Sequence, residues 1–268
     1  MTRRGLAALL GILFAGAIFV YAQKPFKQYR ETAEDYSNYP LPSDWDKPAE
    51  IVIARLKYTD LNRFRYGTSL YWTMDYPRGD RHLVAGLRRL TSMDVRSVEQ
   101  VTEPDGTDDI YNWPFLYGVE VGTMDITEAE AEQLRDYIDR GGFLMVDDFH
   151  NEEEWNTFEY AMDIVFPGHS VIDLDARDPI FHTVSDVNEL IQIPAEQFIQ
   201  TGLTYEKGGI VPHFRAIRDQ KGRIVVVICH NMDLGDALEH SDNPLYPERF
   251  SALAFRVLTN YVTYALSH

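Results

Sequence analysis

The clearest indication of the architecture is the stretch Arg140-Gly-Gly-Phe-Leu-Met-Val-Asp-Asp-Phe-His150. Gly141 and Gly142 are predicted to end a helix, because glycine commonly occupies the left-handed position that follows a helix. Residues 143–146 form an apolar run that has the length of a strand and is too short for a helix. Such runs are typical of parallel sheets that helices cover on both faces. The stretch therefore predicts a central strand of an α/β sheet.

Polar side chains follow two apolar runs of the chain without a spacer. The first run is 143–146, and the second is 224–229 near the C-terminus. In open α/β sheets, ligands bind beyond the carboxyl ends of the strands, where the turns that leave neighbouring parallel strands meet. We therefore expect the two sets of polar residues to lie in one pocket. The predicted ligand-binding residues are Asp147, Asp148, His150, His230, Asn231, Asp233 and Asp236.

These side chains fit several roles, and the sequence leaves the roles open. Carboxylates with one or two imidazoles suit a divalent metal ion, sugar hydroxyls or an acid/base pair. In a simpler interpretation, Asp147 and Asp148 cap the helix that is predicted to begin near Asn151. Asp233 and Asp236 are then turn residues. The sequence contains no zinc-protease motif, Walker loop or dinucleotide fingerprint that would decide among these roles.

Helical and strand patterns alternate along most of the chain. Helices are expected at 81–90, after a capping box at 127–130, from Asn151 to Pro167, and along the C-terminal stripe from Phe250 to Tyr264. Strands are expected at 51–58, 95–101, 115–121, 143–146, 171–174 and 191–194, and segments 214–218 and 223–229 form a hairpin. This pattern predicts a three-layer α/β sandwich with a mainly parallel central sheet and a late hairpin.

The first 22 residues have the pattern of an export signal. Two arginines precede the apolar run 6–20, and Ala22 is a small residue at the expected cleavage point. An uncleaved membrane anchor is the alternative, although a span needs about 20 apolar residues. Residues 23–50 are predicted to be an extended linker, and residues 51–268 a single α/β domain. We expect an exported protein, periplasmic or extracellular, with membrane contact only through its N-terminal segment.

Composition narrows the choice of partners. The chain has 25 Lys and Arg against 42 Asp and Glu, a formal net charge of -17. Nucleic acid is therefore excluded as a partner, because phosphate binding requires a basic face. Cys229 is the only cysteine, so no internal disulfide can form. Since it ends an apolar run, it is predicted to be a buried strand residue rather than a nucleophile.

From about Ile51 to the C-terminus, separate motifs occur in the order of a known family. They are Arg55-Leu-Lys-Tyr58, Trp72…Asp75-Tyr-Pro77, Thr91-Ser92, Pro114-Phe-Leu-Tyr117, Gly141-Gly-Phe-Leu…Asp147-Asp148, Asp178-Pro-Ile-Phe181 and His230-Asn-Met-Asp-Leu-Gly-Asp236. In these motifs the chain resembles the DUF4159 family, a domain of unknown function. The resemblance implies a flavodoxin-like fold similar to that of class I glutamine amidotransferases. It also implies export or membrane attachment, but it implies no established reaction.

The resemblance does not extend to glutamine hydrolysis. Class I amidotransferases carry their nucleophile in a Gly-x-Cys-x-Gly turn after a central strand, whereas this chain has Asp147-Asp-Phe-His150 there. No Gly-x-Ser-x-Gly elbow replaces it. The segment Gly141-Gly-Phe-Leu is also similar to the trehalose-utilisation branch of this fold, which points to carbohydrate by analogy of fold alone.

Two classes of function follow from these observations. The first is an exported, non-enzymatic envelope domain that binds a glycan or an envelope protein at the carboxyl edge of the sheet. The alternative is a metal-dependent or acid/base hydrolase that acts on carbohydrate. We favour the first class because no nucleophile motif is present. The sequence identifies no cofactor and no catalytic residue.

Overall fold

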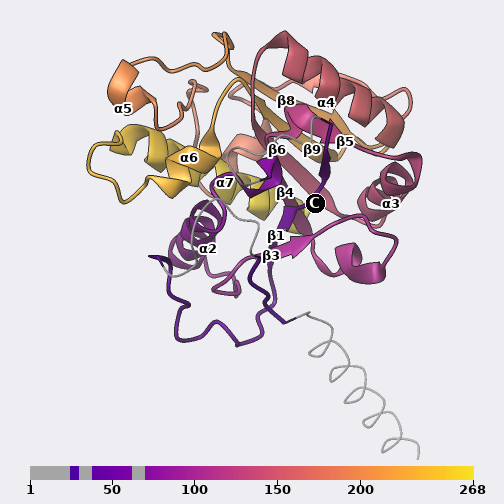
Figure 1. The fold of residues 1–268 in the computed structure, drawn as a ribbon, viewed down its shortest axis with the longest axis horizontal. Helices are drawn as coiled ribbons and strands as arrows, with labels where there is room; N and C mark the ends of the chain where they lie inside the picture. Colours follow the sequence, from indigo (N-terminus) through magenta and orange to yellow (C-terminus); the bar gives the residue numbers. More distant parts are fainter. Residues whose placement is uncertain (1–24, 30–37, 62–69) are drawn as a thin grey trace, which may run out of the picture.

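A seven-stranded sheet forms the centre of the computed structural model, which describes residues 25–29, 38–61 and 70–268 (Figure 1). The order across the sheet is β3-β1-β4-β6-β9-β8-β7. Its strands are β1 (Ile53–Leu56), β3 (Gln100–Thr102), β4 (Phe115–Val119), β6 (Phe143–Phe149), β7 (Val171–Asp173), β8 (His213–Arg218) and β9 (Ile224–His230). Two short strands, β2 (Thr59–Asp60) and β5 (Met124–Asp125), pair separately.

The predicted fold class is confirmed. Strands β3, β1, β4, β6 and β9 are parallel, and β8 pairs antiparallel with both β9 and β7. Numbered along the chain, the five parallel strands have the order 2-1-3-4-5, which is the flavodoxin-like order of a doubly wound sheet. The antiparallel β8–β9 pair is the expected late hairpin. The similarity to amidotransferases stays a prediction.

Helices cover both faces of the sheet (Figure 1). On one face lie α2 (Arg78–Leu90), α6 (Leu234–Glu239) and α7 (Glu248–Ser267), and on the other lie α3 (Glu128–Asp139) and α4 (Asn151–Val165). The short helix α5 (Phe198–Thr201) and the 3-10 turns η2 (Tyr71–Thr73), η3 (Asp108–Asn112), η4 (Val121–Thr123) and η5 (Pro179–His182) lie in connections. Strand β6 alternates, with Phe143 and Met145 toward α7 and Leu144 and Val146 toward α4.

The expected entry into β6 is also observed. The capping box at Thr127 and Glu130 begins α3. Gly141 follows the helix with a φ of 106°, a conformation that favours glycine. A Cβ on Gly142 would lie 2.3 Å from the Tyr137 ring, so only glycine permits this close approach. The two glycines therefore end α3 and bring the chain directly into the central strand.

Some predicted bounds were wrong. Strand β6 continues through Phe149, so the two aspartates lie inside the strand rather than after it. Segment 191–194 is not a strand, and of segment 95–101 only the end belongs to β3. Cys229 is buried in β9, as predicted.

The predicted signal or anchor, residues 1–22, lies outside the described residues. Residues 23–50 are described only in part, and there Asp44 pairs with Arg88 of α2 at 2.6 Å. Within the described residues, no helix is both long enough and apolar enough to span a membrane.

Candidate functional site

A bulge near the end of β6 sets the direction of the two aspartates. Asp147 continues the alternation of Phe143 and Met145 and points toward α6. The register with β9 then shifts between Val146 and Phe149, and Asp148 has a φ of 55°. A bulge inserts one residue and redirects the side chains around it. As a result, both carboxylates lie on the α2 and α6 side of the sheet.

Asp147 caps a helix, but not the one that was predicted. Its Oδ2 accepts hydrogen bonds from the backbone N–H groups of Leu234 at 2.7 Å and Gly235 at 3.0 Å, at the beginning of α6. The Tyr117 hydroxyl donates to the same oxygen at 3.2 Å. Burial, followed by the charge of Asp148, raises the pKa of Asp147 to about 7.

Helix α4 is capped by its own first residues instead. Asn151 Oδ1 accepts hydrogen bonds from the backbone N–H groups of Glu153 at 2.8 Å and Glu154 at 3.1 Å. The Glu154 carboxylate in turn accepts from the His150 N–H at 2.6 Å. The expectation that Asp147 and Asp148 cap this helix was therefore wrong.

The centre of the site is a group that we name the acidic triad, which consists of Asp75, Asp148 and Asp233. One carboxylate oxygen from each lies within 4.8 Å of the others, and the residues are only 8%, 5% and 3% exposed. Burial first, and neighbouring carboxylates second, raise the pKa values of Asp75 and Asp233 well above their ordinary range. Within the described residues, no Lys or Arg forms an ion pair with the triad.

Asp75 is the least compensated member of the acidic triad. Its Oδ2 is buried and has no hydrogen-bond partner among the described residues. It lies against the start of α6, where a Cβ on Gly235 would be 2.0 Å from that oxygen. Gly235 is therefore required for the close approach. By contrast, Asp233 Oδ1 accepts a hydrogen bond of 2.6 Å from the Asp236 N–H as the N-cap of α6.

A second set of groups adjoins the triad through Asp148. His150 Nε2 lies 3.1 Å from Asp148 Oδ1 and 3.9 Å from Glu206 Oε2. Burial alone lowers the pKa of His150, but the hydrogen bond and charge of Asp148 outweigh it, so the pKa is raised. Lys207 Nζ lies 2.8 Å from Glu154 and 3.1 Å from Glu120. We call Asp148, His150 and Glu206 the histidine group.

Two predicted site residues, His230 and Asn231, make supporting contacts instead. The His230 ring packs between Phe149 and Trp155, with ring centres 4.9 and 5.0 Å away, on the α4 side of the sheet. Its Nε2–H donates to the Asn151 carbonyl at 2.9 Å, and burial lowers the pKa of His230 to about 4. The Asn231 side chain bonds the backbone of Asn151 and Val211, both at 2.8 Å.

Asp236 belongs to a neighbouring group. Its Oδ2 accepts a hydrogen bond of 2.7 Å from the Glu196 N–H, and one of its oxygens lies within 4.8 Å of ligand atoms of Glu239 and His240. The structure therefore brings Asp148 and Asp233 together, with Asp147 and His150 beside them. It places His230 and Asn231 in supporting contacts.

Unusual backbone conformations gather at the same edge of the sheet. Among the described residues, the non-glycine residues with positive φ are Asp75, Glu120, Asp148, Asn151, Lys207 and Asn231. Each belongs to the acidic triad, to the Lys207 ion pairs or to the Asn151–Asn231 contact. Such conformations cost free energy, and in proteins they concentrate at functional sites.

The sequence alone did not identify four of the residues at this edge as site residues. Asp75 appeared only within a family motif. Glu120, Glu206 and Lys207 gave no signal at all. Asp75, Glu120 and the adjacent pair Glu206 and Lys207 come from three segments far apart in the chain, so only the fold brings them together. The single usable signal was the Asp-Tyr-Pro motif that begins at Asp75.

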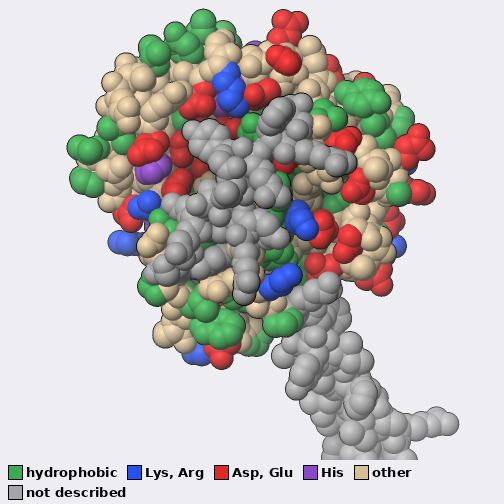
Figure 2. Space-filling view, in the orientation of Figure 1, with side chains coloured by type: hydrophobic (Ala, Val, Ile, Leu, Met, Phe, Trp, Pro, Cys, Tyr) green, Lys and Arg blue, Asp and Glu red, His purple; other side chains and the backbone are tan. Residues whose placement is uncertain are grey.

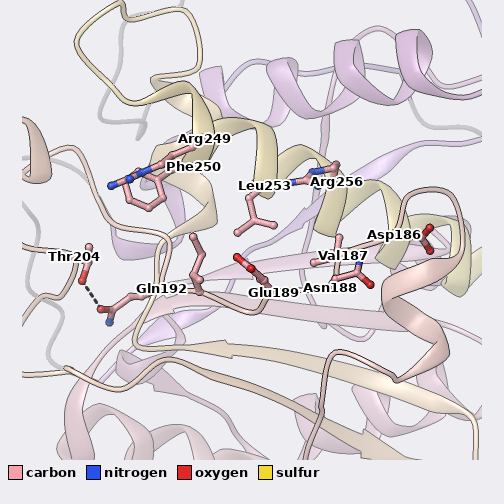
Figure 3. Close-up of a pocket in the computed structure, with 11 residues that line it drawn as sticks. Asp186, Val187, Asn188, Glu189, Gln192, Thr204, Arg249, Phe250, Leu253 and Arg256 are labelled. Atoms are coloured by element: carbon pink, nitrogen blue, oxygen red, sulfur yellow. Dashed lines mark hydrogen bonds between the residues drawn. The ribbon is translucent and has the colours of Figure 1, made fainter.

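An open pocket lies elsewhere and contains none of the predicted residues. It has a volume of about 730 Å³ and lies between α7 and segment 186–192 (Figure 3). Arg249 and Arg256 of α7 line it, with Leu253 between them and Glu189 opposite. Acidic side chains outnumber basic ones over the face drawn in Figure 2, in keeping with the net charge.

Comparison with known proteins gives the family but not the function. Among curated proteins, no relative matches the sequence. A family model does match residues 52–266, which is nearly the whole of the α/β domain described above. The chain therefore belongs to the DUF4159 family, a domain of unknown function.

Proposed function

We propose that this domain binds a divalent cation at the carboxyl edge of its sheet, through the acidic triad. The observation that carries the proposal is the close grouping of three buried carboxylates, within 4.8 Å of one another. Burying charges together is costly unless something compensates them. Asp75 Oδ2, which lacks a hydrogen-bond partner among the described residues, is the oxygen most in need of a ligand.

The three oxygens suit a hard cation such as Ca²⁺, Mg²⁺ or Mn²⁺, which prefer carboxylate ligands. They come from three elements that are distant in the sequence: the loop before α2, the end of β6 and the start of α6. A cation would join these elements at one point. This arrangement supports the cation-dependent class of function over ligand binding without a cation.

Elemental analysis and thermal unfolding test the proposal. We expect purified protein, reloaded after chelation, to hold the cation in stoichiometric amount. At a free concentration of 100 times the Kd, the cation should raise the free energy of unfolding by about 2.7 kcal/mol. Asp233→Asn should abolish both effects while leaving the fold intact, because Asn caps α6 nearly as well.

Glu132→Gln, at an exposed position of α3, is the matched control and should behave as the wild type. Failure of Ca²⁺, Mg²⁺, Mn²⁺ and Zn²⁺ alike to bind or to stabilise the wild type would refute the proposal. The triad would then be neutralised by protons alone.

The glycan or envelope-protein partner is a second candidate function, and the cavity beside α7 supports it. Arg249 and Arg256 have no carboxylate ion pair among the described residues, although the chain is strongly acidic. They leave two positive charges for an acidic saccharide or peptide. Binding of such a ligand that is lost in Arg256→Gln, and kept in Asp233→Asn, would support this function separately from the cation.

We propose export through residues 1–22 on the basis of their sequence pattern alone. The mass of the mature N-terminus tests it. A chain that begins at Gln23 indicates cleavage, and an intact Met1 in the membrane fraction indicates an anchor. An intact Met1 in the soluble cytoplasmic fraction would contradict both.

A further inference from the structure

Asp148 is shared between two groups of potential metal ligands. One is the acidic triad, and the other is the histidine group, whose ligand atoms also lie within 4.8 Å of one another. The histidine group combines an imidazole with two carboxylates. It is the more accessible of the two, because the Glu206 side chain is 22% exposed whereas all three members of the triad are buried.

The distances within the histidine group fit ligands of one ion. His150 Nε2 lies 3.1 Å from Asp148 Oδ1 and 3.9 Å from Glu206 Oε2. Ligand atoms bound at about 2.1 Å from one ion are separated by about 3.0 to 4.2 Å, depending on the angle between them. Both distances fall in this interval.

The polar contacts of the histidine group are incomplete. The buried His150 ring turns its Nε2 toward the two carboxylates, and its Nδ1, on the other side of the ring, has no hydrogen-bond partner among the described residues. Lys207, next to Glu206 in the chain, forms its ion pairs with Glu120 and Glu154, at 3.1 and 2.8 Å, and not with Glu206. Among the described residues, the only side chain that forms an ion pair with Glu206 is His150. Because Glu206 has no Lys or Arg ion-pair partner among the described residues, a cation held by His150 Nε2 and the two carboxylates would compensate its charge.

We propose that the histidine group binds a second divalent cation, so that Asp148 bridges a two-cation centre. This inference rests on the proposed function, because the first cation occupies the acidic triad. Imidazole together with carboxylate suits Mn²⁺ or Zn²⁺ better than Ca²⁺ or Mg²⁺. The two positions thus differ in both accessibility and preference.

Two cations that share a carboxylate are the arrangement that many hydrolases use to activate water and to stabilise the leaving oxygen. Within this centre, the buried triad cation would hold α2, β6 and α6 in place. The more exposed cation of the histidine group would meet the substrate. The chemical class that fits is hydrolysis, in line with the alternative drawn from the sequence.

Titration of the full chain with Mn²⁺, after chelation, tests the inference by stoichiometry. We expect two Mn²⁺ per wild-type chain, one in Glu206→Gln, one in Asp233→Asn and none bound tightly in Asp148→Asn. The electron paramagnetic resonance spectrum of the loaded wild type should show coupling between the two ions, and each single-ion variant should lack it. His240→Asn, in the neighbouring group with Asp236 and Glu239, is the matched control and should keep both ions.

The outcomes separate this inference from the proposed function. One Mn²⁺ per wild-type chain that survives in Glu206→Gln keeps the triad cation and overturns the second site. No bound Mn²⁺, with no other divalent cation binding either, overturns both. Two Mn²⁺ ions that persist in Glu206→Gln would place the second ion elsewhere and overturn the inference. The loss of one Mn²⁺ ion in His240→Asn would do the same. Circular dichroism of each variant confirms that the change in stoichiometry is not a loss of fold.

Discussion

Two sets of buried carboxylates lie near α2, and they differ in what compensates them. Asp80, in the first turn of α2, is fully buried and forms an ion pair with Arg55, with contacts of 2.5 and 3.3 Å. Glu99 is likewise buried and accepts a hydrogen bond of 3.1 Å from Arg81. The acidic triad is buried to a similar degree and has no such partner among the described residues.

The contrast separates structural charge from charge that is left for a ligand. A buried carboxylate with its own guanidinium is compensated within the fold, and removing either partner leaves the other buried and unpaired. In the acidic triad, which has no guanidinium partner among the described residues, burial and neighbouring carboxylates raise the pKa values of Asp75 and Asp233, and protons or a cation must compensate the charge. The two sets of carboxylates should therefore respond differently to the same kind of substitution.

The largest loss of stability is expected at the carboxylates that are paired with arginine. Asp80→Asn leaves the Arg55 guanidinium buried without its counter-charge, which should lower the free energy of unfolding by about 3 to 5 kcal/mol. Equilibrium unfolding in urea measures the change, and it should be the same with and without divalent cations. The control is Asp136→Asn, which breaks an exposed ion pair with Arg140 and should cost less than about 1 kcal/mol. A loss at Asp80 as small as the control would contradict the argument.

The same substitution in the acidic triad should have an effect that changes sign. With a chelator present, Asp75→Asn removes one of three crowded carboxylates and should raise the free energy of unfolding by about 1 kcal/mol. With the cation at 100 times its Kd, the free energy of unfolding of the wild type should rise by about 2.7 kcal/mol, and that of the variant should not rise. Unfolding curves of both proteins under both conditions give the answer. Equal destabilisation under both conditions would show that Asp75 has only a structural role.

The sequence predicted the strands and helices that carry the site better than it predicted the arrangement of the side chains in the site. The apolar runs of β6 and β9, the capping box of α3 and the glycines at 141 and 142 are local signals, so the sheet and its late hairpin could be predicted. The bulge at Asp148 could not, because it depends on the register between two strands. The capping of α6 by Asp147 joins residues 87 and 88 positions apart, which no local pattern encodes.

The grouping of His230 with its strand neighbours, by contrast, was available from the sequence. Side chains alternate along a strand, so His230 must share the face of Val226 and Ile228. That both residues pack toward α4, away from the acidic triad, is shown only by the structure. Because residues 224–229 are all apolar, the sequence does not indicate which face of the sheet His230 occupies. Asp75 was beyond such reasoning, because it comes from an irregular loop.

A loss of stability of intermediate size is expected from His230 as the pH falls. Burial lowers the pKa of His230 to about 4, although the hydrogen bond from its Nε2–H to the Asn151 carbonyl opposes this, so the folded protein holds the neutral ring. The unfolded chain protonates His230 near its ordinary pKa of about 6.5. Between these values the unfolded state binds more protons, so stability falls as pH decreases from about 6.5 to about 4.

The loss that His230 contributes should be about 1 to 2 kcal/mol, because solvent partly screens the ring. His230→Gln keeps an N–H donor and removes the titration, so its stability should decline less steeply over this interval. Chemical unfolding of both proteins at several pH values, with a chelator present, measures the difference. Parallel pH profiles would mean that His230 does not titrate as the structure indicates.

The smallest expected effect is that of the backbone conformation at Asp148, measured apart from its charge and compared with Asp80. Asp148 has a φ of 55°, where glycine is free of the steric cost that a Cβ imposes. Asp148→Gly and Asp148→Ala both remove the carboxylate, so their difference isolates the backbone. Without cation, the glycine variant should be more stable than the alanine variant by about 1 kcal/mol. At Asp80, inside the first turn of α2, the alanine variant should instead be more stable than the glycine variant by about 0.5 to 1 kcal/mol, because alanine favours the helix. Urea unfolding of the four variants measures both differences. If alanine is also the better residue at 148, the bulge does not hold Asp148 in the left-handed conformation, and its direction toward the acidic triad has another cause.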